Sequence, residues 1–276
     1  TTPGAEANMF KTPLKALLLG SALLATSFAS KAQNMHDSWN ALLNNHVVAI
    51  NHGHSTEVDY TAIKAKRKEL KTYLDSLSAV TQNEFDTWEK PKQLAFLINA
   101  YNAFTVELIL TKYPDLKSIK DLGSFFSSPW SKEFIFLLGK TRSLDNIEHD
   151  LIRGSGKYND PRIHFAVNCA SIGCPALREE AYTAKKLEAQ LHQQTVRFLS
   201  DTSRNKLQGN TLKLSSIFKW YKGDFTKGFG GANSLSQFLL LYVDALNLGP
   251  AQQQKLTSGD MKIDFLDYNW DLNARR

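Results

Sequence analysis

The sequence predicts a single α+β domain, in which a buried central helix packs on a small, mostly antiparallel sheet. Helix-spaced and strand-spaced segments follow one another without the strand–helix–strand rhythm of a parallel sheet. Residues 93–109 (QLAFLINAYNAFTVELI) are apolar on nearly every side, so this helix should lie in the core. The stretch 33–276 is long enough for one well-buried domain and contains no low-complexity linker.

The first 32 residues are not expected to belong to this domain. Residues 1–8 precede the first methionine and read as residues added by cloning. Residues 9–32 combine lysines, a short apolar run and small residues near the end (SKA, 30–32), which is the pattern of a secretory signal peptide. The apolar run is too short to span a bilayer comfortably. We therefore expect a periplasmic or secreted protein without stable membrane insertion after cleavage.

The N-terminal half is predicted to be mostly helical. Residues 39–54 are predicted to form a helix followed by a turn around 52–54, and residues 61–78 are predicted to form a second helix. The buried helix should continue to Lys112 and end before Pro114, because the residue before a proline avoids helical geometry. A Gly-Lys pair between two short strand-like runs predicts a hairpin over 134–144.

The C-terminal half is predicted to mix strands and helices. Asp145 and Glu148 fit a capping box at the start of a helix that ends at Arg153. Alternation over 163–168 predicts a strand, and Pro175 predicts the first turn of a helix that ends near Ala181. The same reasoning gives helices over 184–199 and 234–246, a hairpin over 206–214 and a last strand over 261–268.

Composition excludes several classes of function. The formal net charge is +6 and the basic residues are spread along the chain, so we expect no nucleic-acid partner. The sequence contains no P-loop, no G-x-S-x-G and no dinucleotide fingerprint, and we expect no cofactor. His52 and His54 have no third ligand nearby in the sequence, so we expect no metal site.

Residues 164–175 (HFAVNCASIGCP) contain both cysteines of the chain and are the strongest candidate for a reactive site. On a strand, His164 and Asn168 would point to the same face. Cys174 would cap the helix that begins at Pro175, and the partial positive charge of a helix N-terminus lowers the pKa of a thiol. The expected roles are Cys174 as thiolate, His164 as base, Asn168 as orienting residue and Cys169 as resolving thiol.

A second interpretation of this stretch stays open. In an oxidising compartment the two cysteines can form a disulfide, with His164 as an ordinary buried histidine. The loop between Cys169 and Cys174 is so short that such a disulfide would add little stability through chain entropy. Local loop shape or chemistry is then the better reason for the pair.

Further side chains are candidates for binding a ligand. Arg162 and Arg178 offer planar forks for a carboxylate. Asn99 and Asn102 on the buried helix either hold a neighbouring loop or line a polar pocket, since buried amides need partners. Tyr101 on the same helix and Trp220 complete the candidate set, and Trp220 lies in a run that we expect to be exposed, together with Phe218, Tyr221 and Phe225.

Several motifs resemble one known family. The stretch 160–182 (DPRIHFAVNCASIGCPALREEAY) resembles the signature of the domain of unknown function 547 family, and the segments 95–109, 143–153, 215–225 and 263–273 resemble its other motifs in order. The resemblance covers about residues 60–273. It implies a site built around the cysteine loop, and glutaredoxin-like modules in some family members suggest thiol or glutathione-type chemistry. A distant likeness to papain or transglutaminase folds is also implied, although no cysteine lies on 93–109, where the nucleophile of those folds would be.

Taken together, we expect an uncharacterised exported protein with a thiol-centred site that binds or acts on a small peptide or thiol compound, such as a glutathione-like molecule. As an enzyme it would be a cysteine-dependent hydrolase, transferase or thiol-exchange enzyme. The alternative is a non-catalytic periplasmic binding or scaffold module with a structural Cys169–Cys174 disulfide.

Overall fold

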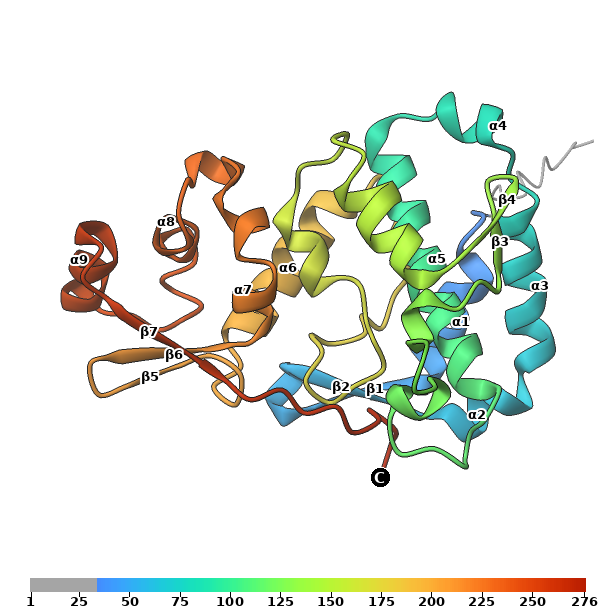
Figure 1. Cartoon of the computed structure of the whole chain (residues 1–276), viewed down its shortest axis with the longest axis horizontal. Helices are drawn as coiled ribbons and strands as arrows, with labels where there is room; N and C mark the ends of the chain where they lie inside the picture. Colours follow the sequence, from blue (N-terminus) through green and yellow to red (C-terminus); the bar gives the residue numbers. More distant parts are fainter. Residues whose placement is uncertain (1–33) are drawn as a thin grey trace, which may run out of the picture. The chain divides into compact units, whose positions relative to one another are not determined.

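The structure is a computed structural model that describes residues 34–276 (Figure 1). The expected signal peptide and the eight residues before it lie outside the described residues. The helices are α1 (Asp37–His46), α2 (Tyr60–Ala65), α3 (Arg67–Ser78), α4 (Gln82–Asp86), α5 (Lys90–Leu110), α6 (Leu187–Leu199), α7 (Ile217–Trp220), α8 (Leu235–Leu240) and α9 (Pro250–Ser258). The strands are β1 (Val47–Ile50), β2 (Ser55–Val58), β3 (Ile135–Leu137), β4 (Lys140–Arg142), β5 (Lys206–Gln208), β6 (Thr211–Ser215) and β7 (Lys262–Leu266). A π-helix, η4, spans Asn146–Arg153, and 3-10 turns fill several loops, among them η5 (Pro161–Phe165) and η6 (Lys222–Thr226).

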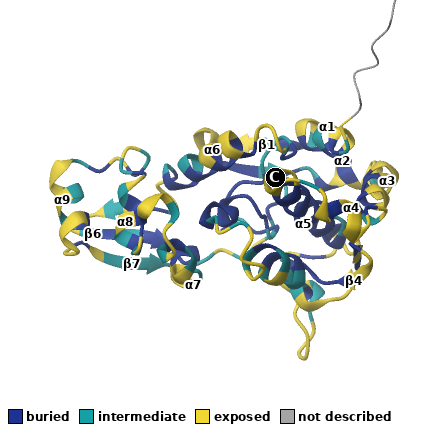
Figure 2. Ribbon diagram, turned by 90° about the horizontal axis from the view of Figure 1, so that it is seen from above, coloured by how far each residue is buried: buried dark blue, intermediate teal, exposed yellow. Residues whose placement is uncertain are grey.

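Helix α5 forms the centre of the larger hydrophobic core (Figure 2). It packs against α3 on one side and against η4 on another. By length and composition α5 could cross a membrane, but 94% of its most apolar window is buried inside the domain. It is therefore the core helix of this unit, as its uniformly apolar sequence predicts.

A second core lies around the C-terminal sheet. Strands β5 and β6 are antiparallel, and β7 returns parallel to β6. Phenylalanines fill this core, with Phe218 and Phe225 completely buried and their ring centroids 4.9 Å apart. Phe165, from the loop region beside α5, joins the same cluster, so the two cores meet next to the cysteine stretch.

The chain after β7 runs back to the first hairpin and binds the cysteine loop on its way (Figure 1). The amides of Gly173 and Ile172 donate to the carbonyls of Asn269 and Asp271, both at 2.8 Å. Two residues after Asp271, the carbonyl of Asn273 accepts the amide of Val58 in β2 at 2.9 Å. We call residues 268–275 the C-terminal strap, because they tie the cysteine loop to β2.

The predicted α+β class is confirmed, with a buried apolar helix and small sheets. The hairpins near 134–144 and 206–214 form where predicted. The first predicted helix ends earlier than expected, at His46, because residues 47–50 pair with 55–58 as a hairpin, and the turn predicted around 52–54 joins these two strands. The helix over 61–78 breaks at Lys66.

Two local predictions around the cysteines are wrong. Residues 163–168 form no strand: the Asp160 side chain accepts the amide of Arg162 at 3.0 Å and starts the 3-10 turn η5 instead. No helix follows Pro175, so Cys174 is not a helix N-cap. The expected capping box at Asp145 is also absent, because that segment forms a π-helix without a side-chain cap.

Candidate active site

A cavity of about 340 Å³ opens beside the two cysteines and is the candidate active site. One end is formed by Cys169, Cys174 and Pro175. The opposite end is formed by ionisable side chains of η4 and η5. Aromatic rings from α7 and from the C-terminal strap complete the wall. Segments far apart in the sequence therefore build one chamber around the sulfur atoms.

Cys169 and Cys174 are joined by a disulfide. Both cysteines line the cavity, but Cys174 is buried whereas Cys169 is half-buried. The Cys174 Sγ atom lies 3.2 Å from the amide nitrogen of Cys169 and 3.4 Å from that of Ser171, and both amides donate to it. The inner sulfur therefore sits in a small pocket of N–H donors, which suits a thiolate better than a neutral sulfur.

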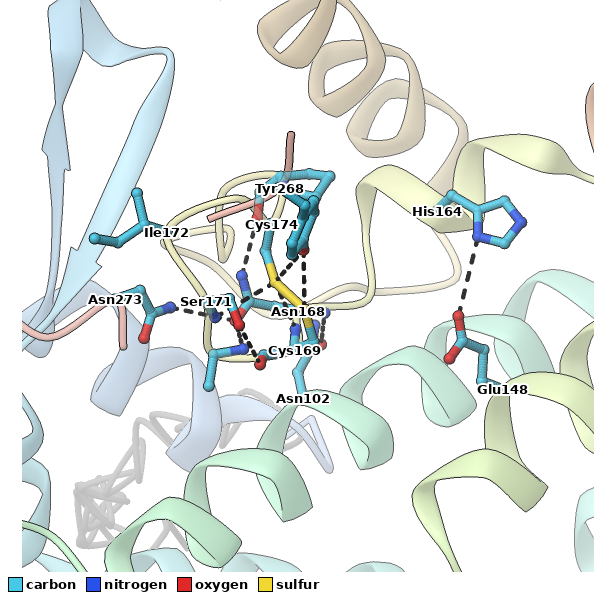
Figure 3. Close-up of a disulfide and its surroundings, with 12 residues drawn as sticks. Asn102, Glu148, His164, Asn168, Cys169, Ser171, Ile172, Cys174, Tyr268 and Asn273 are labelled. Atoms are coloured by element: carbon cyan, nitrogen blue, oxygen red, sulfur yellow. Dashed lines mark hydrogen bonds and ion pairs between the residues drawn. A yellow bond between two sulfur atoms is a disulfide. The ribbon is translucent and has the colours of Figure 1, made fainter. Parts of the chain in front are cut away.

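Tyr268 adds a third donor to this pocket (Figure 3). Its hydroxyl lies 3.1 Å from Cys174 Sγ and 3.2 Å from Cys169 Sγ. Burial raises the pKa of Tyr268, so the phenol keeps its proton and can donate it in a hydrogen bond. One O–H group thus spans both sulfur atoms of the disulfide.

Asparagine side chains hold the cysteine loop in place. Asn102 of α5 accepts the amide of Asn168 at 2.8 Å and donates to the carbonyl of Ala166 at 3.0 Å. Asn168 in turn accepts the amide of Ala170 at 2.9 Å and donates to the carbonyl of Pro175. Ala170 has a left-handed backbone (φ 62°), which is uncommon for a residue other than glycine and costs about 1 kcal/mol. The asparagines make this backbone shape possible and thereby position the amides that face Cys174.

His164 lies at the opposite end of the cavity. Its Nε2 atom is 2.7 Å from Asp224, and its ring stacks on Tyr221 with centroids 4.0 Å apart. Burial lowers the pKa of His164 more than Asp224 raises it, so the ring is neutral at physiological pH and donates Nε2–H to Asp224. Figure 3 shows its other nitrogen turned towards Glu148, and no hydrogen bond joins the ring to either sulfur atom within the described residues.

Asp224 is the anion of this cluster. Burial opposes its ionisation, but hydrogen bonds from His164 and from Arg153, whose Nε lies 2.6 Å away, hold its pKa well below the usual range. Arg153 also contacts Nδ1 of His149 at 2.7 Å. The arrangement fixes the tautomer of His164 and leaves its Nδ1 lone pair towards the cavity.

The other predicted ligand-binding residues have different surroundings. Arg162 is buried in a double ion pair with Asp160 and Glu188, and Arg178 pairs with Glu180. Neither arginine lines the cavity. Asn99 holds the loop at Tyr182 through two hydrogen bonds, 2.8 Å and 2.9 Å long, so both asparagines of α5 hold loops.

Tyr101 and Trp220 do line the cavity. Trp220 is 47% exposed, and its ring stacks on Trp270 with centroids 5.9 Å apart. The prediction of an exposed aromatic run holds only for Trp220 and, in part, Tyr221, because Phe218 and Phe225 belong to the second core.

Sequence reasoning missed several residues of the site. Asp224 lies within the stretch 215–225 and Tyr268 within 263–273, and both stretches resemble family motifs, but nothing in their local pattern ties them to the cysteines. Asp224 meets His164 across 60 residues, and Tyr268 meets Cys174 across 94 residues. Among residues 34–276, no group of three or more His, Cys, Asp or Glu side chains has the arrangement of a metal site.

Comparison with known proteins gives one match. Residues 85–199 match the family model described as "Protein of unknown function, DUF547". This segment begins before α5, contains η4, η5 and both cysteines, and ends with α6. Neither the curated proteins nor the solved structures give a significant match. The segment of the chain that carries the cysteine loop therefore matches the DUF547 family of proteins of unknown function.

Proposed function

We propose that this domain carries out thiol–disulfide exchange with a small thiol compound or peptide at the Cys169–Cys174 disulfide. The proposal includes export to the periplasm or the outside of the cell. The signal-like segment 9–32 supports export, as does the pairing of the cysteines, since disulfides persist in oxidising compartments.

The chemical step is a direct displacement at sulfur. The thiolate of the ligand attacks Cys169 Sγ, and a new ligand–Cys169 disulfide forms. The Cys169–Cys174 bond breaks, and its electron pair leaves on Cys174 Sγ as a thiolate. In the reverse direction Cys174 attacks the mixed disulfide and releases the ligand thiol, so the reaction is balanced without a further oxidant.

The observation that carries this proposal is the set of donors around Cys174 Sγ. Two amides and the Tyr268 hydroxyl point at this atom, at 3.1–3.4 Å. Stabilising the leaving thiolate lowers its pKa, and a thiol of lower pKa leaves faster. Cys169 has the complementary property: both cysteines line the cavity, but Cys169 is the more exposed of the two, so a ligand attacks it.

This proposal keeps the expected role of Cys174 but changes the groups that stabilise its thiolate. Cys174 remains the stabilised thiolate, but the donors are loop amides and a tyrosine in place of a helix N-terminus. His164 has no sulfur contact and acts, in this proposal, on the part of the ligand at the far end of the cavity.

The alternative function is a binding or scaffold module whose disulfide only fixes the loop. The hydrogen bonds from the asparagines and the C-terminal strap to this loop favour it, because they hold the same loop shape that a structural disulfide would. The two functions differ in whether Cys169 exchanges with small thiols.

Trapping a mixed disulfide tests the proposal. The Cys174→Ser variant has only Cys169, which should form an adduct with 2-hydroxyethyl disulfide rapidly, as seen by mass spectrometry. The matched Cys169→Ser variant has only the buried Cys174 and should react more slowly. If Cys169 in the folded Cys174→Ser protein reacts no faster than Cys174, the exchange function is wrong and the structural alternative holds.

A further inference from the structure

Within residues 34–276, the carboxyl group of Glu148 accepts no hydrogen bond and makes only two loose ion-pair contacts, both with histidines. Its side chain is only 8% exposed and lines the cavity. Its oxygens face Nε2 of His149 at 3.8 Å and Nδ1 of His164 at 4.0 Å, and both distances exceed hydrogen-bond length. Buried carboxylates normally accept several hydrogen bonds, so this site lacks a donor that a ligand can supply.

The remaining charges of the cavity do not fill this role. Asp145 lies 3.5 Å from Nε2 of His149 and raises the pKa of that ring, so these two groups balance each other. His164 is neutral, as shown above. No lysine or arginine of residues 34–276 lines the cavity. Burial raises the pKa of Glu148 more than His149 and Arg153 lower it, which shows how weakly the surroundings compensate this carboxyl group.

The aromatic rings that line the same cavity provide the second observation. The rings of Tyr268 and Trp270 have centroids 4.5 Å apart, and Trp130 packs on Trp270 at 5.5 Å. The faces of such rings attract cations. Two rings of the wall already hold a cation of the chain: Lys120 Nζ lies 4.1 Å above Trp270, and Arg153 lies 4.8 Å above Tyr221.

We infer that the cavity selects a thiol or disulfide that carries a primary ammonium group, with the ammonium on Glu148 among the aromatic rings and the sulfur at Cys169. This inference rests on the proposed exchange function and names its substrate class: an amino thiol or the amino end of a small peptide. An ammonium group supplies the missing donors and the missing positive charge together. A mainly anionic ligand finds no lysine or arginine among the lining residues of the cavity within the described chain, because Arg162 and Arg178 lie elsewhere.

Binding without sulfur chemistry tests the inference independently of exchange. The probes are 1,6-diaminohexane, the carbon analogue of cystamine, with 1,6-hexanediol as neutral match and adipate as anionic match. Tryptophan fluorescence reports occupancy, since Trp130, Trp220 and Trp270 line the cavity. We expect saturable binding of the diamine alone, weakened about tenfold by Glu148→Gln, which corresponds to one lost charged contact.

Controls separate binding from folding. Glu84→Gln changes an exposed glutamate of α4 and should leave diamine affinity unchanged. Glu148→Gln should raise the free energy of unfolding at neutral pH, because it removes a buried carboxyl group whose folded pKa is raised. Hexanediol or adipate binding as tightly as the diamine overturns the inference, as does full diamine affinity in the Glu148→Gln protein.

Exchange rates then separate the two proposals. The reduced protein should react faster with cystamine than with 2-hydroxyethyl disulfide, and slowest with 3,3′-dithiodipropionate. Equal rates for the three disulfides overturn the ammonium selectivity and leave the exchange function standing. Diamine binding without reaction of any disulfide supports the ammonium site and contradicts the exchange function.

Discussion

At the scale of single residues, two effects compete at the Cys174 sulfur. Burial favours the neutral thiol and raises its pKa, whereas donors directed at the atom favour the thiolate. Hydrogen bonds to a charged group contribute about 1.5–3 kcal/mol each. We expect three such bonds together to exceed the free-energy cost of burying the charge of the Cys174 thiolate. The pocket of Cys169 N, Ser171 N and Tyr268 Oη is therefore expected to lower the pKa of the reduced Cys174 thiol.

Removing one donor should slow exchange without unfolding the protein. Tyr268→Phe deletes the hydroxyl at 3.1 Å from Cys174 Sγ and keeps the ring in the aromatic wall. We expect exchange with a small thiol to be about tenfold slower, because about 1.4 kcal/mol of leaving-group stabilisation is lost. The measurement is the rate of disulfide reduction by that thiol in stopped flow.

Tyr113→Phe is the matched control, since its hydroxyl contacts only Thr61 on the surface. That variant should exchange at the wild-type rate. A Tyr268→Phe protein that also exchanges at the wild-type rate would show that the hydroxyl gives the leaving thiolate no support.

At the scale of elements, the cysteine loop is held between α5 and the C-terminal strap. Gly173 is the point of closest approach: a Cβ atom there would lie 2.9 Å from the carbonyl oxygen and 3.0 Å from the amide nitrogen of Asn269. These are backbone atoms and cannot rotate away. The glycine thus allows the loop to reach the strap that carries Tyr268.

Gly173→Ala should therefore loosen the site through packing alone. We expect the free energy of unfolding to fall by about 1–3 kcal/mol, measured by denaturant titration, because the added methyl group overpacks the contact. Gly223→Ala is the control, since a Cβ at that glycine meets no atom within 4 Å. Equal stability of the two variants would mean that the strap adjusts to the loop freely.

The elements that could be predicted from the sequence are those with local causes. The apolar run of α5 and the turn residues of the hairpins at 134–144 and 206–214 carry their own signals. The strand over 163–168 could not be excluded locally, because Ile163, Phe165 and Val167 also suit a buried turn. What decides it is the Asp160 cap and the hydrogen bond from the Asn168 amide to Asn102, which lies 66 residues away.

The candidate site was predictable only in part for the same reason. The cysteines, His164 and Asn168 are neighbours in the sequence, and the structure keeps them in one region. The roles of the individual residues could not be predicted, because Tyr268 and Asp224 come from distant segments of the sequence. Tyr268 donates a hydrogen bond to Cys174 at one end of the cavity, and Asp224 binds His164 at the other end. Arg162 does not line the cavity, because it is buried elsewhere in the domain. A buried guanidinium group without a partner is costly in free energy, and Arg162 is paired with the carboxylates of Asp160 and Glu188.

At the scale of the whole molecule, the disulfide should contribute little to stability. It closes a loop with a sequence separation of only 5, for which loop entropy gives about 2 kcal/mol. The Cys169→Ser/Cys174→Ser double variant should therefore stay folded, with the free energy of unfolding lowered by no more than about 2 kcal/mol. Circular dichroism and urea titration check this, and loss of the folded state would assign the pair a mainly structural role.

Acid should destabilise the domain through a buried histidine outside the site. Burial lowers the pKa of His36 to about 4, while the unfolded chain keeps a value of about 6.5. The unfolded state then binds the extra proton first, so stability present above about pH 6.5 is lost as the pH falls towards the folded pKa. Protonation of His36 alone should lower the free energy of unfolding by about 3 kcal/mol between about pH 6.5 and about pH 4.

The measurement is urea titration of the wild-type protein and of His36→Gln across this pH range. The variant should be less stable at neutral pH and should lose less stability on acidification. His46→Gln changes a histidine that is not buried and serves as the control. Parallel pH profiles for the wild-type and His36→Gln proteins would contradict the prediction.

The pKa of the Cys174 thiol tests the central claim most directly. In the Cys169→Ser protein Cys174 is the only cysteine, and the backbone amides and Tyr268 that face it are retained. Its thiolate is followed by ultraviolet absorbance against pH. The account predicts a pKa below the ordinary value of about 8.5. A value of about 8.5 or higher, as for a thiol buried without effective donors, would contradict it.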